Sequence, residues 1–239
     1  MVLAEDDLET VMVAVRDGRT IYNNIRKALR FLLATNFSEI MVMLATVAAG
    51  LPAPLGAMQL LWINLISDIF PGLALAMETP EPDVLDRPPR SGEEPIVKSS
   101  DFKRLAFESG TLTAGALGAY AYGIARYGLG ERAGALTFQS LTMGQLLHSI
   151  SCRSEKHSIF GGEKLPPNRY LNMALGGSFV IQLLTMFVPG LRDLLGLAPL
   201  SLLDGAVIAG TATLPLLINE GTKNLTDVRP PASEAAELI

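Results

Sequence analysis

The chain has 239 residues, of which 49% are hydrophobic and 18% are charged, and its mean hydropathy is +0.33. This balance favours a protein that lies in lipid over a soluble domain of ordinary composition. The formal net charge of -5 and the lack of a long basic run in the sequence argue against nucleic acid as a partner. The single cysteine, Cys152, permits neither an intrachain disulfide nor a thiolate metal cluster.

Long apolar stretches alternate with short charged stretches along the chain. A helix that crosses a bilayer needs about 20 mainly apolar residues. The segments that meet this requirement are 28–50, 55–77, 105–127, 135–152, 170–188 and 200–218. The sequence therefore predicts an all-α fold, a polytopic bundle of six transmembrane helices that occupies residues 28–220.

The basic residues indicate how this bundle is oriented. If the N-terminus is cytoplasmic, sixteen Lys and Arg residues lie on the cytoplasmic side, and only Arg126, Arg132 and Arg192 lie on the other. Cytoplasmic loops retain positive charge. We therefore expect both termini to be cytoplasmic and the protein to lie in the plasma (inner) membrane.

The segments outside the predicted spans indicate connectors. Residues 7–30 predict an amphipathic helix that is interrupted at Gly18 and restarts at Thr20 as its N-cap, so we assign 1–27 to a cytoplasmic stalk. Five prolines between Glu78 and Arg104 exclude a continuous helix there, and this loop is expected to lie along a partner surface. Residues 221–239 are expected to form a cytoplasmic tail.

Two of the predicted spans carry polar side chains at membrane depth. Asn36 and Glu39 lie in the first span, and the second span carries Asn64, Ser67 and Asp68. Spacings of three and four place each set on one helical face. At a rise of ~1.5 Å per residue, both sets lie near the middle of the bilayer. Polar groups are costly at this depth and mark ion passage or pairing.

These side chains offer only oxygen as a ligand atom. Hard cations such as Ca²⁺, Mg²⁺, Na⁺ and K⁺ prefer oxygen ligands, and two carboxylates suit a divalent ion. The alternative is a hydrogen-bonded polar cluster that holds helices together without an ion. Pro71 favours the ion, because it leaves the carbonyl of Ser67 without its helical donor and should open the helix just after Asp68.

The remaining polar residues carry less information. We interpret Gln145 as an amide oxygen near the same depth, with an interhelical hydrogen bond as its alternative role. His148 and His157 are expected to be isolated residues rather than ligands. Glu108 and Asp204 are expected to be solvated anchors near span ends. Close helix packing is predicted by the small residues Gly110, Gly115, Gly118 and Gly123.

Several runs resemble a known family. The residues from Val2 to Ile25 are similar to the join between phosphorylation domain and membrane stalk in P-type cation-transporting ATPases of the calcium-pump and sodium-pump type. Thr35-Asn36-Phe37-Ser38-Glu39 resembles that family's fifth helix, and Gln59–Asp68 resembles its sixth. Asp86-Arg87-Pro88-Pro89-Arg90 is similar to the loop that follows. The resemblance is strong over residues 1–100 and weaker beyond them.

The resemblance implies that the six spans are the last six of ten in a complete pump, and that residues 1–27 include the end of the phosphorylation domain. It implies Ca²⁺ as the favoured transported ion, with Mn²⁺, Mg²⁺, Na⁺ and K⁺ as other candidates. Gln145 lies near the place where a two-calcium pump has an eighth-helix glutamate. The candidate metal ligands are therefore Asn36, Glu39, Asn64, Ser67, Asp68 and Gln145.

Much of a pump is not present in this sequence. It contains no Asp-Lys-Thr-Gly-Thr phosphorylation motif, no Thr-Gly-Asp-Gly motif, and no nucleotide-binding or actuator domain. We therefore expect no catalytic residue and no ATP site in this chain, and an incomplete cation site. The expected partners are the lipid bilayer, the three missing cytoplasmic domains and the first four membrane helices, in cis or as another subunit.

Two other classes of function fit the same residues. One is a stand-alone membrane scaffold or regulatory subunit that moves no ion. The other is a passive cation channel that has no ATPase activity and uses the same carboxylates, Glu39 and Asp68. A neighbouring polypeptide or reading frame that carries the phosphorylation motif would favour the pump over both.

Overall fold

A computed structural model describes residues 8–86, 95–154, 157–161 and 165–226. Its helices are α1 (Leu8–Ala48), α2 (Ala57–Ile63), η1 (Asn64–Ile69), α3 (Phe70–Ala76), α4 (Ser99–Tyr127), α5 (Glu131–Ser151), α6 (Arg169–Phe187), α7 (Pro189–Leu194) and α8 (Leu202–Thr226). No strand occurs within the described ranges. The predicted all-α class is therefore confirmed.

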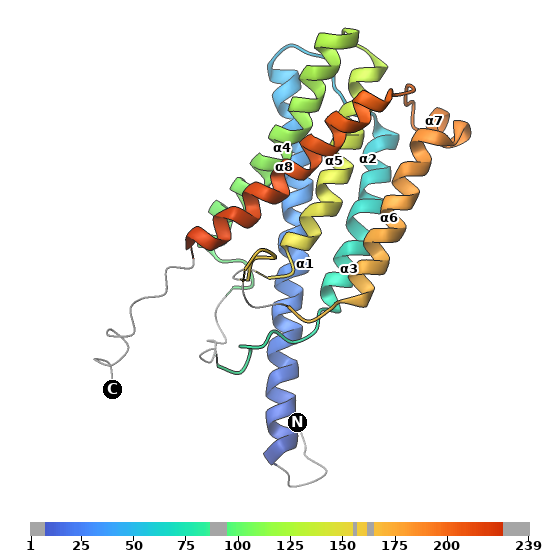
Figure 1. Cartoon of the computed structure of the whole chain (residues 1–239). Helices are drawn as coiled ribbons and strands as arrows, with labels where there is room; N and C mark the ends of the chain where they lie inside the picture. Colours follow the sequence, from blue (N-terminus) through green and yellow to red (C-terminus); the bar gives the residue numbers. More distant parts are fainter. Residues whose placement is uncertain (1–7, 87–94, 155–156, 162–164, 227–239) are drawn as a thin grey trace.

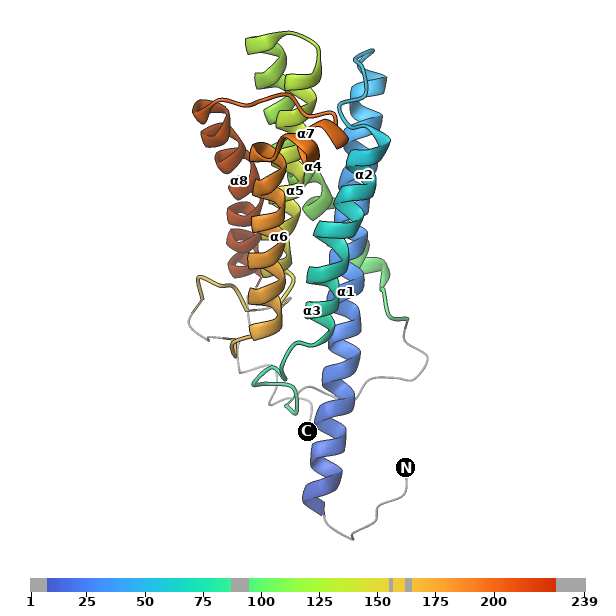
Figure 2. The same ribbon diagram turned by 90° about the vertical axis from the view of Figure 1, so that its right-hand side faces the viewer.

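The long helices run side by side and alternate in direction (Figures 1 and 2). Gly50, with φ +68°, turns the chain between α1 and α2 in the left-handed region that favours glycine. This turn, the α4–α5 turn and α7 lie at one end of the bundle (Figure 1). The starts of α1, α4 and α6 and the ends of α3, α5 and α8 lie at the other end.

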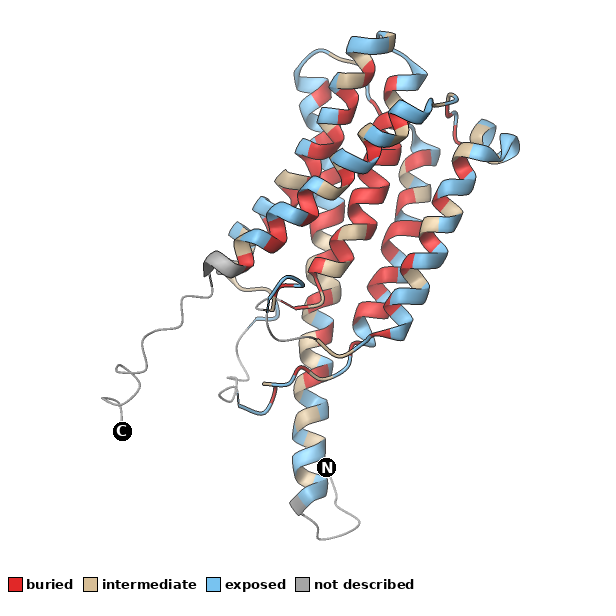
Figure 3. Cartoon of the chain, viewed as in Figure 1, coloured by how far each residue is buried: buried red, intermediate tan, exposed pale blue. Residues whose placement is uncertain are grey.

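Four stretches are long and apolar enough to cross a membrane, namely Glu9–Ala48, Ala57–Ala76, Arg169–Phe187 and Leu202–Lys223. The predicted spans 105–127 and 135–152 fall on α4 and α5, which do not meet this measure of length and hydropathy. The reason is clearest for α5, which is buried along most of its length (Figure 3). Because its side chains face other helices instead of lipid, the helix can be polar.

Among the described residues, three apolar clusters hold the helices together around α5, and two of them lie on either side of the predicted ligands. One cluster, on the side of the Gly50 turn, includes Val42, Ile63, Phe138 and Leu141. The other, on the side of the stalk, includes Phe31, Leu75, Leu146 and Leu171. Along α1, the second span and α5, most of the predicted ligands fall between these two clusters. The apolar packing therefore brings polar positions of three helices to one level.

The stalk is the part of α1 that projects beyond the other helices (Figure 2). The predicted interruption at Gly18 is wrong, because one helix runs from Leu8 to Ala48. Thr20 is not an N-cap, since its hydroxyl donates to the carbonyl of Arg16 within the helix at 2.7 Å. A glycine inside a helix costs only about 1 kcal/mol relative to alanine, which is too little to break a helix this long.

The loop after α3 lies against the stalk of its own chain. Arg19 Nη1 donates to the carbonyls of Val84 and Leu85 at 3.0 and 3.1 Å, and Lys27 Nζ lies 2.6 Å from Glu81 Oε1. The matched positions Arg87 to Arg90 lie outside the described residues. Helix α8 continues to Thr226 and so extends into the predicted tail, 221–239.

Close packing of α4 on α8 gives a test of this arrangement. A Cβ added at Gly115 would lie 2.5 Å from the carbonyl oxygen of Thr211 and 3.2 Å from Cγ of Pro215, whereas one added at Gly110 would meet nothing within 4 Å. We predict that Gly115→Ala destabilises the protein by about 1 to 3 kcal/mol, the cost typical of overpacking. Thermal unfolding in detergent, followed by circular dichroism, measures the loss.

Gly110→Ala is the matched control for Gly115→Ala. It adds the same methyl group to the same helix, and it should leave the melting temperature unchanged or raise it, since alanine is the better helix former. Equal melting temperatures for the two variants would show that α4 and α8 are not packed as described.

Candidate cation-binding site

The backbone of the second span departs from α-helical geometry at the predicted ligands. Asn64–Ile69 forms the π-helix η1, and Pro71 follows in the first turn of α3. Proline lacks the N–H that would bond to the carbonyl of Ser67, and π-helical turns occur frequently at functional sites. The sequence predicted an opening just after Asp68, whereas the distortion begins at Asn64 and surrounds Ser67 and Asp68.

Asn36 on α1 holds Asp68 on η1. Its Nδ2 donates to Asp68 Oδ2 at 3.1 Å and to the carbonyl of Leu32 at 2.8 Å. Asp68 is 4% exposed, and its other oxygen, Oδ1, is buried without a hydrogen-bond partner. The neighbouring hydroxyl of Ser67 is also buried without a partner. Two adjacent side chains of η1 thus present oxygens that the protein does not satisfy.

Glu39 on α1 meets Gln145 on α5. Gln145 Nε2 donates to Glu39 Oε1 at 3.1 Å, which confirms the interhelical hydrogen bond considered for this glutamine. The same nitrogen lies 3.3 Å from the carbonyl oxygen of Thr35 and 3.4 Å from Ser38 Oγ. Gln145 Oε1 is buried and has no partner. The side chain therefore orients Glu39 through its nitrogen and keeps its oxygen available.

Glu39 and Asp68 are close enough to interact electrostatically. Both residues are buried, with 6% and 4% of their surface exposed. No basic side chain pairs with either of them in the described part of the chain. Other buried glutamates do have such partners: Glu78 pairs with Arg153, Glu81 with Lys27, Glu108 with Arg30 and Glu220 with Lys223. Buried carboxylates without a countercharge are costly, so this pair favours a bound cation.

The structure brings together five of the six predicted ligands and places the sixth apart. Asn64 is exposed, and its Nδ2 donates to the carbonyl of Leu60 on its own helix at 2.9 Å. Within the described residues, no hydrogen bond joins Asn64 to the other five candidates. Asn36 is also exposed, although it contacts Asp68.

Two further residues of the site, Thr35 and Ser38, were not predicted. Both are fully buried, and both offer an oxygen to Gln145. Thr35 lies four residues before Glu39 and Ser38 lies three residues after Thr35, so the position of Thr35 on α1 could have indicated that it lines the same site. Small hydroxyl residues are common in membrane helices, and this made them easy to pass over.

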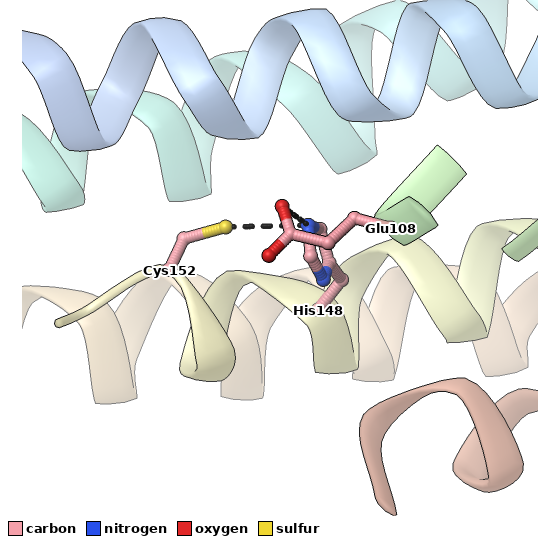
Figure 4. Close-up of side chains that lie close together, drawn as sticks. All are labelled: Glu108, His148 and Cys152. Atoms are coloured by element: carbon pink, nitrogen blue, oxygen red, sulfur yellow. Dashed lines mark hydrogen bonds and ion pairs between the residues drawn. The ribbon is translucent and has the colours of Figure 1, made fainter. Parts of the chain in front are cut away.

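A second polar cluster lies where α4 and α5 meet (Figure 4). The ligand atoms of Glu108, His148 and Cys152 all lie within 4.8 Å of one another, and His148 Nε2 is 3.7 Å from Glu108 Oε2 and 3.3 Å from Cys152 Sγ. Glu108 and His148 are 0% and 1% exposed. The predictions of a solvated Glu108 and an isolated His148 are therefore wrong. Because α4 begins at Ser99, Glu108 lies inside the bundle instead of at a helix end.

Charge argues against a metal ion in this cluster. Glu108 already binds the guanidinium groups of Arg30 and Arg104. A divalent ion would add positive charge to a buried place that already carries two arginines and one carboxylate, which is unfavourable. The arrangement is that of a buried ion-pair network, in which His148 and Cys152 contact each other and His148 contacts the carboxylate.

Two other sequence-based expectations also fail. Asp204, expected to be solvated, is 1% exposed and accepts hydrogen bonds from the Tyr127 hydroxyl at 2.9 Å and the Ser201 N–H at 2.7 Å. His157 is not isolated, since its Nε2 lies 3.7 Å from Asp83 Oδ1. The ligand atoms of Glu81 and Asp83 group with that of His157 within 4.8 Å, but Lys27 already neutralises Glu81.

Comparisons with known proteins identify the family of this chain. The family model described as "Cation transporting ATPase, C-terminus" matches residues 52–225. The chain is 33% identical to the calcium-transporting ATPase of Bacillus subtilis (strain 168), covering 93% of this chain and 25% of that protein. It is 30% identical to calcium-transporting ATPase type 2C member 1 of Homo sapiens, covering 94% of this chain and 24% of that protein.

Calcium-transporting ATPase 1 of Bacillus cereus (strain ATCC 10987 / NRS 248) is also 30% identical, over 92% of this chain and 26% of that protein. The chain thus spans about a quarter of the length of the curated relatives it matches. The helices, the apolar spans and the family match over most of the chain agree with one another. This chain therefore belongs to the P-type cation-transporting ATPases, as a C-terminal transmembrane portion.

Proposed function

We propose that this chain is the cation-binding transport domain of a P-type pump that translocates Ca²⁺. The observation that carries the proposal is a set of unsatisfied oxygens, Ser67 Oγ, Asp68 Oδ1 and Gln145 Oε1, beside two uncompensated carboxylates. Each buried polar atom left without a partner costs about 1 to 3 kcal/mol. A hard cation coordinated by these oxygens would remove that cost. The printed names of the relatives support Ca²⁺ as the ion.

The surrounding contacts suit a site that binds an ion and releases it. Asn36 fixes one oxygen of Asp68 and leaves the other available, and Gln145 does the same for Glu39 with its own nitrogen. The π-helical turn and Pro71 make the carbonyl of Ser67 a further candidate ligand, as at broken helices of other transporters. Asn36 and Asn64 are exposed on this chain, where a helix of the complete pump would cover them and raise the affinity of a site that this chain already forms.

We also propose that α4 and α5 cross the bilayer, which gives six spans. Both run through the bundle alongside α1 and α8 (Figure 1), so a membrane that holds those helices also surrounds these two. The stalk end is then cytoplasmic, in agreement with the distribution of basic residues, and the membrane is the plasma (inner) membrane. ATP hydrolysis comes from the phosphorylation, nucleotide-binding and actuator domains of the complete pump, in cis or on another subunit.

Direct cation binding to the purified chain tests this function. We predict that the chain in lipid nanodiscs binds Ca²⁺, and that Asp68→Asn weakens binding at least tenfold, about 1.4 kcal/mol, because it removes one of two buried negative charges. Glu39→Gln should weaken it strongly as well. Trp62 is the only tryptophan and lies in the same span as Asp68, so its sensitisation of Tb³⁺ emission, with competition by Ca²⁺, reports the affinity.

Asp204→Asn is the control for loss of a buried carboxylate. Asp204 lies at the start of α8, near the end of the bundle that holds the Gly50 turn, and it accepts hydrogen bonds from Tyr127 and Ser201. The affinity of the Asp204→Asn variant for Ca²⁺ should equal that of the unmodified chain. If Asp68→Asn keeps full affinity, or if the unmodified chain binds no Ca²⁺, the proposed site is not a cation site.

A second prediction concerns stoichiometry. We predict that a complete pump bearing this segment carries one divalent ion per ATP, because Glu39 and Asp68 are the two carboxylates of the site and Gln145 adds no charge. Gln145→Glu adds a third carboxylate at the same place and should raise the ratio or the affinity for a second ion. Ca²⁺ uptake and ATP hydrolysis measured together in sealed vesicles give the ratio. A value near two for the unmodified pump contradicts the prediction.

A further inference from the structure

The Glu108 cluster, made of Glu108, Arg30, Arg104 and His148, is a buried ion-pair network that the proposed transport site does not use. Glu108 is fully buried. Arg30 Nε donates to Glu108 Oε2 at 3.0 Å and Arg30 Nη2 donates to the other oxygen. Arg104 Nε donates to Glu108 Oε1 at 2.8 Å. Two guanidinium groups therefore meet at one carboxylate.

The Glu108 cluster connects four helices. Glu108 and Arg104 belong to α4, Arg30 to α1, and His148, whose Nε2 faces the carboxylate, to α5 (Figure 4). Arg104 extends the network to α8, because its Nη1 donates to Thr222 Oγ1 at 2.8 Å and its Nη2 to the carbonyl of Asn219 at 2.9 Å. One buried carboxylate thus lies at the junction of α1, α4, α5 and α8.

Two of these four helices, α1 and α5, also contribute to the proposed cation site, together with η1. Arg30 precedes Glu39 by nine residues on α1, and His148 follows Gln145 by three residues on α5, which correspond to roughly 13 and 5 Å along the helix axes. The pair α1 and α5 is therefore tied at two levels. One tie is the Glu39–Gln145 hydrogen bond, and the other is the contact of Arg30 and His148 with Glu108.

Two ties on one pair of helices restrict both rotation and sliding, which a single hydrogen bond does not do. The tie at Glu108 also lies where α1 leaves the bundle and becomes the stalk. It therefore separates the cation site from movements of the stalk. If Glu108 loses its charge, the two partly buried guanidinium groups lose the carboxylate that they share. Arg30 has a long side chain that is 12% exposed, so without this carboxylate it can turn toward water and no longer hold α1 against α4.

We propose that Glu108 is a positioning residue for the cation site: its carboxylate holds Arg30 on α1 and His148 on α5 in the register that lets Glu39 meet Gln145. Glu108 itself contacts no ion in this arrangement. The inference rests on the proposed function, and it assigns to the network a role in affinity beyond its contribution to folding.

The test compares Glu108→Gln with a carboxylate of equal burial that does not contact α1. Glu220 on α8 is fully buried and accepts from Lys223 Nζ at 2.6 Å, Ser158 Oγ at 3.0 Å and the Ile159 N–H at 2.7 Å. Both substitutions replace a buried, ion-paired glutamate by glutamine, and both should lower the melting temperature. Only Glu108→Gln should change the affinity for the cation.

The affinity is measured on the purified full chain in nanodiscs by Trp62-sensitised Tb³⁺ emission with Ca²⁺ competition. We expect Glu108→Gln to weaken Ca²⁺ binding by about tenfold or more, the effect typical of outer partners of a metal site, and Glu220→Gln to change it by less than about twofold, an effect too small for a lost outer partner. The double variant with Arg30→Gln and Glu108→Gln should lose no more affinity for Ca²⁺ than Glu108→Gln alone, since both residues act through one contact.

Each outcome separates the two proposals. Unchanged affinity in Glu108→Gln, or an equal loss in Glu220→Gln, overturns the positioning role, while binding by the unmodified chain and its loss in Asp68→Asn keep the proposed function. If the unmodified chain binds no Ca²⁺, the proposed function fails first. If Glu108→Gln does not fold, Arg30→Lys replaces it: the charge is kept but the forked contact is lost, and unchanged affinity in that variant overturns the positioning role.

Discussion

The structure depends on the burial of two carboxylates, Glu39 and Asp68, that the chain does not neutralise itself. Elsewhere in the described residues, buried glutamates pair with a basic side chain, as Glu78 does with Arg153 and Glu81 with Lys27. Such pairing is the usual condition for burying a charge. At the level of Glu39 and Asp68, amides take its place, and the proposed cation would supply the countercharge.

This constraint explains the composition of the bundle. Helix α5 is polar because it runs through the centre, where its amide and hydroxyl groups meet other helices, and the outer helices supply the apolar surface that faces lipid. The second span gives up regular α-helical geometry over Asn64–Ile69, which turns Ser67 and Asp68 inward. Buried ion pairs stay on the stalk side, where Arg30 and Lys27 link α1 to its neighbours.

Much of this could be predicted from the sequence, since apolar periodicity and the spacing of Asn36, Glu39, Ser67 and Asp68 are local properties of helices. The failures concern properties set by neighbouring helices. Glu108, Asp204 and His148 each have a partner on another helix, which the sequence does not show. Asn64 shares the spacing of its neighbours, and its amide donates to the carbonyl of Leu60 on its own helix. The predicted interruption at Gly18 failed for another reason. The low helix propensity of one glycine costs too little to break a helix that runs from Leu8 to Ala48.

The most direct measurement is the position of a bound ion in a structure of the purified chain. Crystals grown or soaked with Tb³⁺, which takes the oxygen ligands of Ca²⁺, give an anomalous signal that locates the metal without reference to activity. The account predicts an ion in contact with Asp68 Oδ1 and with oxygens of Glu39, Ser67 and Gln145. An empty site at this level, or an ion found only at Glu81 and Asp83 beside the stalk, would contradict it.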